Sequence, residues 1–281
     1  MKTGRIPRRL SAIAAAGALA LAAGLPAGAG SLSYTGSVQY STGRYFFDRA
    51  TSGVYFFNGF SLLSGRFSLA ANIPLIYQST PYVSYTGVGV LPSGGDEGST
   101  LVRGRRGGEV VVLPVVTEYT SFGLGDPMVS AGLELVKESG VVPSLRVNGQ
   151  VKLPVASPDK GFGTGKWDWS GGLALSKRFG GTFLFANLDY WVLGDLPELE
   201  LENVWAYALA LGRSFAGGKT AVLVSYYGSS RVIAEVKPAS ALGLGLSFKS
   251  GRQGTITLNG ALGLSEASPD FSFSLGWSVG L

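Results

Sequence analysis

The feature that most constrains this chain is a two-residue alternation of apolar with small or polar side chains, repeated in segments of about ten residues. In the last segment, Phe271, Phe273, Leu275, Trp277, Val279 and Leu281 alternate with Ser272, Ser274, Gly276, Ser278 and Gly280. Successive side chains of a β-strand point to opposite faces, so such a segment forms a strand with one apolar face. Membrane-spanning strands contain about 9–11 residues and alternate in this way. The pattern predicts a transmembrane β-barrel.

The same alternation recurs along the chain, at 32–41, 67–77, 129–135, 144–153, 169–175, 242–248 and 256–264. Four other stretches, near 51–62, 182–193, 203–214 and 219–228, are apolar on both faces. Periodicity alone does not decide the structure of such stretches. The first and last strands are expected to pair, because lipid does not tolerate an open sheet edge.

Short and long connections alternate between these segments, as they do in outer-membrane barrels. Short links occur at Ser64-Gly65, Ser139-Gly140, Gly180-Gly181, Gly217-Gly218 and Ser250-Gly251, and longer links at 42–50, 79–126, 154–167, 194–202, 229–238 and 265–270. Five periplasmic turns and six extracellular loops join twelve strands. We therefore expect an all-β, antiparallel, up-and-down barrel of twelve strands, with both ends in the periplasm. A barrel of ten strands remains an alternative, because the four stretches that are apolar on both faces are assigned as strands only from the alternation of short and long connections.

We expect residues 1–29 to be a cleaved signal peptide and residues 30–281 to form the barrel. Basic residues precede an apolar run over 10–25, and Ala27-Gly28-Ala29 fits the pattern that a signal peptidase accepts. We expect the protein to be exported through this signal and to be located in the bacterial outer membrane. Four of the 23 basic residues and none of the 18 acidic residues lie in this segment. The mature net charge is therefore about +1, which does not support a nucleic-acid partner.

Composition argues against an enzyme or a metalloprotein. The chain contains no Cys and no His, which excludes a disulfide scaffold, the usual zinc ligands and the Ser-His-Asp or Cys-His catalytic arrangements. Only 15% of the residues are charged and 43 of 281 are Gly, whereas a soluble domain needs a densely charged exterior. No mature segment is apolar for the ~18 residues of a membrane helix. We expect no catalytic residue, no cofactor and no metal ion.

Glycine-rich elements give the chain a family resemblance. They are Gly123-Leu124-Gly125-Asp126-Pro127 and the segment from Lys152-Leu153-Pro154 through Gly161-Phe162-Gly163-Thr164-Gly165. With Ser176-Lys177-Arg178-Phe179, Asn187-Leu188-Asp189-Tyr190 and Gly194-Asp195, they resemble the outer-membrane proteins associated with meta-cleavage phenol degradation. The resemblance covers about residues 120–281, while residues 30–119 match only as generic barrel strands. It implies a transporter that passes small hydrophobic or aromatic compounds across the outer membrane.

Polar side chains that point into the barrel are the candidate functional residues, since they line any aqueous path. Strand alternation points Glu134, Arg146, Asn148, Gln150, Lys152, Asp168, Arg178, Asn187 and Asp189 inward. They either determine selectivity or brace the lumen through an internal network, for example an ion pair of Glu134 with Arg146 on neighbouring strands. The sequence leaves both alternatives open.

The stretch 79–126 is far longer than the other loops and contains Arg103, Arg105 and Arg106. It either folds into the mouth of the barrel as a constriction or extends its two hairpin strands above the membrane. In a third alternative, the arginines bind phosphates of surface lipopolysaccharide, because guanidinium groups suit phosphate. The sequence does not separate these alternatives.

The function expected from these features is passive passage of small hydrophobic or aromatic molecules across the outer membrane. The alternative is a closed barrel with a structural or surface-interaction role, its interior filled by side chains and by the long loop. The expected partners are outer-membrane lipid and lipopolysaccharide, the barrel assembly machinery and small hydrophobic solutes. The sequence does not indicate an oligomeric state.

Overall fold

The computed structural model describes residues 30–45, 50–79, 83–92, 121–156, 158–195, 200–234, 236–251 and 253–281. Its strands are β1 (Ser31–Gly43), β2 (Thr51–Ser64), β3 (Phe67–Gln78), β4 (Val83–Thr86), β5 (Gly89–Pro92), β6 (Ser121–Leu124), β7 (Met128–Val136), β8 (Ser144–Lys152), β9 (Asp168–Phe179), β10 (Thr182–Val192), β11 (Val204–Phe215), β12 (Thr220–Ser229), β13 (Ser240–Ser250), β14 (Gly254–Gly263) and β15 (Phe271–Gly280). In these ranges the helices are two short 3-10 turns, at Pro158–Lys160 and Ala216–Gly218. No helix of the described residues is long and apolar enough to cross a membrane.

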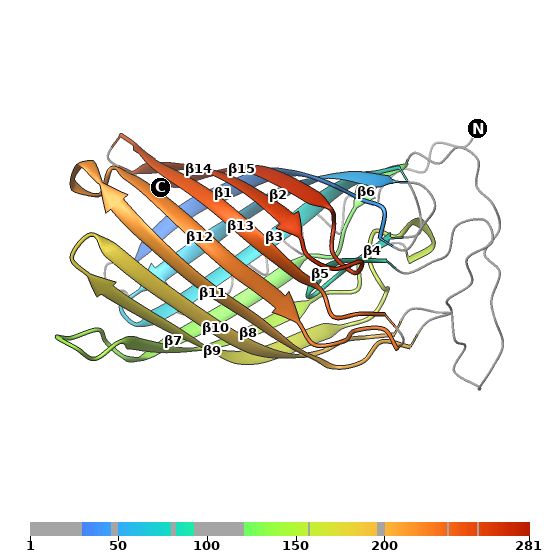
Figure 1. Ribbon diagram of the computed structural model, residues 1–281, viewed down its shortest axis with the longest axis horizontal. Helices are drawn as coiled ribbons and strands as arrows, with labels where there is room; N and C mark the ends of the chain where they lie inside the picture. The colour runs from blue at the N-terminus through green and yellow to red at the C-terminus, as the bar shows by residue number, and fades with distance from the viewer. Residues whose placement is uncertain are drawn as a thin grey trace.

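The strands form one closed antiparallel barrel (Figure 1). It closes where β1 pairs with β15, in register from Ser33 opposite Gly280 to Thr42 opposite Phe271. Both β6 and β7 pair with β3, so they form one interrupted strand of the wall. The thirteen strands of the sheet therefore make a twelve-stranded barrel, and the predicted number is confirmed.

The two ends of the barrel differ in how the strands are joined. At the turn end, β2–β3, β7–β8, β9–β10, β11–β12 and β13–β14 are joined by two to seven residues. Gly65, Gly140, Gly180, Gly217 and Gly251 in these turns have φ between 52° and 66°. This left-handed conformation suits glycine, which has no Cβ. At the loop end, the connections that join one wall strand to its neighbour, with β6 and β7 counted as one strand, have seven residues or more.

Alternation along the strands separates an outer face from an inner face. Large apolar side chains are exposed on the outer face, as contact with lipid requires; they include Leu173, Leu175, Leu184, Leu209, Leu244, Leu262 and Phe273. Tyr190 and Trp205 contact each other on this face, with ring centroids 4.9 Å apart. The inner face of β11 to β15 carries mainly Ala, Gly and Ser, so the lumen on this side is lined by small side chains.

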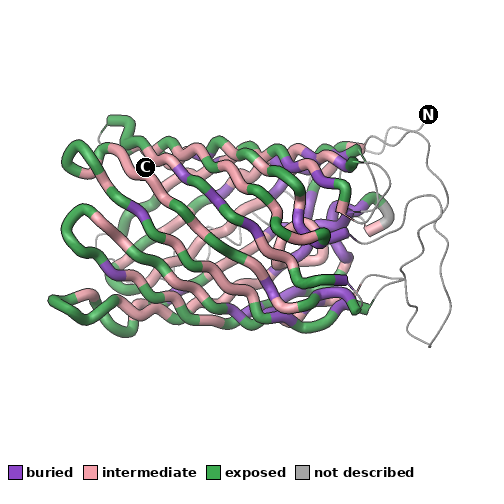
Figure 2. Tube along the Cα trace, viewed as in Figure 1, coloured by how far each residue is buried: buried purple, intermediate pink, exposed green. Residues whose placement is uncertain are grey.

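The β4–β5 hairpin lies inside the loop end of the barrel (Figure 1). Tyr85 of β4 packs against Tyr55 and Ile76 from the inner faces of β2 and β3. Leu91 of β5 packs in a second apolar cluster with Trp191 of β10. Buried residues are accordingly concentrated at the loop end, whereas the turn end is mostly exposed or half-buried (Figure 2).

Two of the three alternatives for loop 79–126 describe parts of the observed structure. Residues 83–92 fold into the barrel as a hairpin, and the pairing of β6 with β3 extends the wall beyond β7. The Arg103, Arg105 and Arg106 cluster lies outside the described residues, as do residues 1–29 of the expected signal peptide. Contact with lipopolysaccharide and signal cleavage therefore stay predictions.

Candidate functional site: the lumen and its loop end

Lys152, one of the predicted inward-facing residues, is the centre of a buried ionic cluster at the loop end. Its ammonium donates hydrogen bonds to Asp126 Oδ2 at 2.6 Å, Thr164 Oγ1 at 3.0 Å and the Lys166 carbonyl oxygen at 3.0 Å. Asp168 Oδ2 lies 3.5 Å from the same nitrogen. The side chains of the lysine and both aspartates are fully buried. Since an ammonium has three donors, this geometry uses all of them.

The two carboxylates of this Lys152 cluster connect segments that are remote in the sequence. Asp126 Oδ1 accepts hydrogen bonds from the backbone N–H groups of residues 155–156, at 2.8 and 2.7 Å. Asp168 accepts one from Gly87 at 2.7 Å, at the tip of the β4–β5 hairpin, and one from Gly194 at 2.9 Å, after β10. Buried charges are stable only when they are paired and hydrogen-bonded. The cluster therefore fastens the hairpin to the barrel wall.

The glycine-rich elements of the sequence supply most of the cluster. The first contributes Asp126, and the second contributes Lys152 and Thr164. A Cβ on Gly163 would lie 2.1 Å from Asp126 Oδ2, so only glycine lets the loop approach the carboxylate this closely. Asp126 and Thr164 were missed as inward-facing residues, because neither lies in a strand with clear alternation. The glycine spacing around them was the signal that could have found them.

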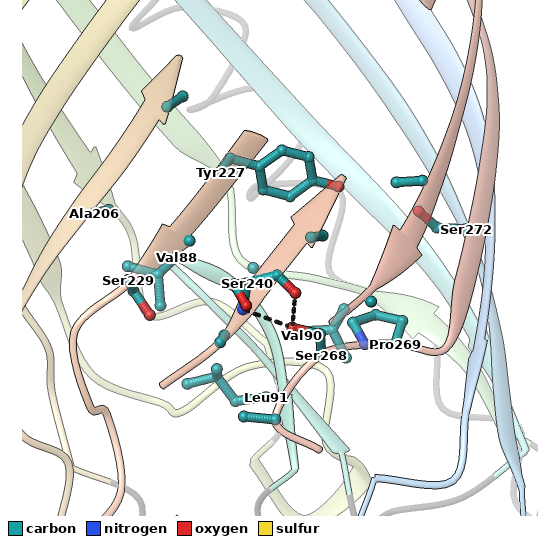
Figure 3. Close-up of a pocket in the computed structure, with 18 of the residues that line it drawn as sticks. Val88, Val90, Leu91, Ala206, Tyr227, Ser229, Ser240, Ser268, Pro269 and Ser272 are labelled. Carbon is teal, nitrogen blue, oxygen red and sulfur yellow. Dashed lines mark hydrogen bonds between the residues drawn. The ribbon is translucent and has the colours of Figure 1, made fainter. Parts of the chain in front are cut away.

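A cavity of about 320 Å³ lies between the β4–β5 hairpin and the inner faces of β11 to β15 (Figure 3). Residues 88–91 of the hairpin form one side, and mainly Ala, Gly and Ser form the other. None of the described residues that line it is charged. Ser268 Oγ accepts a hydrogen bond from the Ser240 N–H and donates one to the Ser240 carbonyl, both at 2.9 Å, which holds the β14–β15 loop against β13.

A second cavity of about 290 Å³ lies on the side of the first that faces the turn end. The two cavities share Gln39, Tyr227, Ala261 and Ser272. In Figure 3 the Tyr227 hydroxyl points toward Ser272 across the inner face of the wall. Tyr227 is the largest of the shared side chains, and it lies where the two cavities adjoin.

Arg146, Glu134 and their neighbours lie nearer the turn end. Arg146 and Glu134 face each other in the β7–β8 register, but the ion pairs of the described residues do not include one between them. Arg146 Nη1 instead donates a hydrogen bond to Ser68 Oγ of β3 at 2.9 Å. Arg146 therefore contacts a hydroxyl group two strands away, on β3, in place of Glu134.

The remaining predicted residues lie on β8, β9 and β10. Asn148 donates a hydrogen bond to Asn187 Oδ1 at 3.3 Å, and the Asn187 amide donates one to Asp189. Gln150 stands opposite Ser130 and Ser170 in the β8 register, and Arg178 is exposed near the turn end. No group of three or more Asp or Glu side chains in the described part of the chain could hold a metal ion.

The closed sheet, its exposed apolar outer face and its internal cavities define an outer-membrane β-barrel. Residues 82–280 match the family described as "Putative MetA-pathway of phenol degradation". Because the match covers more than half of the chain, the protein belongs to this family. The match begins well before residue 120, so it includes the β4–β5 hairpin, where the sequence motifs had shown no resemblance.

A solved structure of an outer-membrane channel shares the fold. The chain is similar to the COG4313 outer membrane channel from Pseudomonas putida F1, with a TM-score of 0.63 and 13% identity, over 92% of this chain and 97% of that one. It is also similar to the P. putida toluene transporter TodX, with a TM-score of 0.42 and 10% identity, over 91% and 90% of the two chains. No curated protein matches the sequence. The first of these likenesses supports the barrel fold.

Proposed function

We propose that this protein is a passive outer-membrane channel for small, uncharged and largely apolar molecules. The observation that carries the proposal is the cavity beside the β4–β5 hairpin, whose described lining is uncharged and consists mainly of small residues. Such a lining accepts apolar solutes and offers a few hydroxyl groups for orientation. It offers no compensating charge, so charged solutes bind in this cavity less well than uncharged ones.

The arrangement of the lumen supports passage beyond this cavity. A solute at the loop end would cross the level of Tyr227 and reach the second cavity, which lies toward the turn end. The family description names phenol degradation, and phenol-like molecules are compact enough for this route. We therefore take small aromatic compounds as the solute class.

A closed barrel with a structural or surface-interaction role is the second candidate. The observation in its favour is the hairpin, which packs inside the loop end and is fastened there through Gly87 and Asp168. A hairpin that stays fastened inside the loop end would favour a closed barrel. Contacts with lipopolysaccharide and with the barrel assembly machinery belong to both candidates.

Uptake by whole cells separates the two candidates. Cells that lack other porins and express this protein would be compared for their initial rate of uptake of radiolabelled benzyl alcohol. The proposal predicts faster uptake with the wild type than without it. It also predicts that Ala261→Phe, which fills the space between the two cavities, abolishes the gain.

The control for this experiment lies one residue further along β14. Leu262 is on the outer face and is 55% exposed, so Leu262→Phe adds the same ring outside the lumen. Its uptake should equal that of the wild type at equal amounts of protein in the membrane. If cells with any of the three proteins and cells without them take up benzyl alcohol at the same rate, the closed barrel with a structural or surface-interaction role is favoured.

A further inference from the structure

The β7–β8 turn, residues 137–143, differs from the other connections at the turn end. It has seven residues, whereas the other four turns have two to four. Its sequence contains Val141, Val142 and Pro143, whereas the others consist of small, polar or charged residues. In Figure 1 it is the green turn at the lower left. A longer turn with bulky apolar residues at its tip calls for a physical explanation.

Hydrogen bonds from Lys177 of β9 hold the turn against the barrel wall. Leu175 and Phe179 share its face of the strand and are exposed there, so the lysine belongs to the outer, lipid-facing side of the wall. A lysine in contact with lipid is costly unless its ammonium reaches polar groups. The ammonium donates hydrogen bonds to Glu138 Oε1 at 3.1 Å, to the Gly140 carbonyl and, at 3.4 Å, to the Val142 carbonyl.

The end of β9 provides a second attachment for the same turn. β8 begins at Ser144, opposite Ser176, so the backbone N–H of Arg178 lies beyond the last β8 partner. Glu138 Oε1 accepts a hydrogen bond from this N–H at 2.9 Å. The turn therefore replaces the missing stretch of β8 along the edge of β9, on the outer side of the wall.

The shape of the turn itself then directs its apolar tip away from the barrel. The register of β7 shifts between Glu134 and Val136, and such a bulge bends the end of a strand. Ser139 and Val142 pair through two backbone hydrogen bonds, which leaves Gly140 and Val141 at the tip. Val141 is 90% exposed, so no part of the described chain covers it.

We propose that the β7–β8 turn is a membrane-contacting element that rests Val141 and Val142 in the periplasmic leaflet of the outer membrane. Lipid is the occupant that fits, because the hydrogen bonds of Lys177 to the Gly140 and Val142 carbonyls hold the exposed valines beside the face of β9 that carries the exposed Leu175 and Phe179. The Lys177 ammonium, covered by Glu138 and two carbonyl groups, is thereby kept from contact with that lipid. This inference rests on the barrel fold and does not depend on transport.

The absence of cysteine from the chain makes a direct test available. Val141→Cys gives a single site for a nitroxide spin label, and the full mature chain is refolded into vesicles of phosphatidylethanolamine and phosphatidylglycerol. Gln253→Cys, in the β13–β14 turn, is the matched control. We expect the label at 141 to be more accessible to oxygen than to a water-soluble nickel complex, and the label at 253 to show the opposite order.

Two results would overturn the proposal. Access of the nickel complex to 141 equal to that at 253 would place the tip in water, and protection of 141 from both reagents would place it against protein, such as a second copy of the chain. Lys177→Met in the Val141→Cys background tests the attachment itself. The label should then move toward water, and an unchanged depth would show that Lys177 does not position the turn.

Discussion

The loop end and the turn end of this barrel have the same strands but different kinds of contact. At the loop end, remote segments meet in two apolar clusters and in the fully buried Lys152 cluster. At the turn end, short turns join neighbouring strands, and the ion pair of Lys177 with Glu138 leaves the carboxylate about a third exposed. The comparison teaches that the wall follows local sequence patterns, whereas the hairpin inside its loop end is held in place by long-range contacts.

The largest expected effect is the loss of the buried charge at the loop end. Lys152→Met leaves two buried aspartates without their cation, and removal of one partner of a buried pair costs about 3–5 kcal/mol. The free energy of unfolding in urea, measured on protein refolded into vesicles, checks this value. Lys177→Met at the turn end should cost no more than about 1 kcal/mol, because water can solvate Glu138. Equal costs at the two ends would break the comparison.

Displacement of the hairpin is expected to have the next largest effect, on conductance. A Cβ on Gly87 would lie 2.3 Å from the ring of Trp191, so Gly87→Val should push the hairpin out of the mouth. Single-channel recordings should then show a larger conductance than that of the wild type. Gly89 has a positive φ and open space around its Cβ, so Gly89→Ala is a control for backbone strain without the collision. An identical conductance for all three proteins would contradict a narrowing role of the hairpin.

A charge reversal in the open part of the lumen should change ion selectivity more than stability. Arg146 donates to Ser68 on the inner face, so Arg146→Glu changes the charge along the path and should shift the reversal potential toward cation selectivity. Arg213 lies near the same end of the barrel, on the outer face, and its guanidinium is 5.8 Å from the Phe215 ring. Arg213→Gln should leave the reversal potential unchanged. No shift for Arg146→Glu would assign that residue to bracing alone.

The smallest expected effect is a pH dependence at the turn end. The backbone N–H of Arg178, and then the Lys177 ammonium, hold the pKa of the Glu138 carboxyl below its usual value. A carboxyl whose pKa is lowered by folding stabilises the protein above its unfolded pKa, and this contribution is lost as the pH falls through the folded pKa. Wild type and Glu138→Gln should therefore differ in unfolding free energy at neutral pH and converge as the pH falls through the lowered pKa of Glu138. A difference that persisted in acid would contradict this assignment.

The wall could be predicted from the sequence because its rules are local. The alternation in 271–281 and the glycines of the turns depend on neighbours in the chain, and the twelve-stranded barrel followed from them. The reason why some stretches are apolar on both faces became clear only in the structure. Tyr55 of β2 and Trp191 of β10 face inward and are apolar because they pack on the hairpin.

The site was predictable only in part, for the same reason. Alternation pointed Lys152 and Asp168 inward, but nothing in the spacing showed that they share a cluster with Asp126 and Thr164. The widest of these contacts, between Lys152 and Asp126, joins residues 26 positions apart through loops that have no periodicity. Folding of loop 79–126 into the mouth was likewise one of three alternatives, since the burial of residues 83–92 depends on strands on both sides of the lumen.

The most direct test of the central claim is single-channel recording from the refolded wild type in a planar bilayer while benzyl alcohol is added. The account predicts discrete ion steps that benzyl alcohol reversibly blocks, because it occupies the uncharged cavity on the path. Benzoate at the same concentration should block less, since its carboxylate finds no compensating charge there. A bilayer that shows no ion steps, or steps that benzyl alcohol leaves unchanged, would contradict the claim.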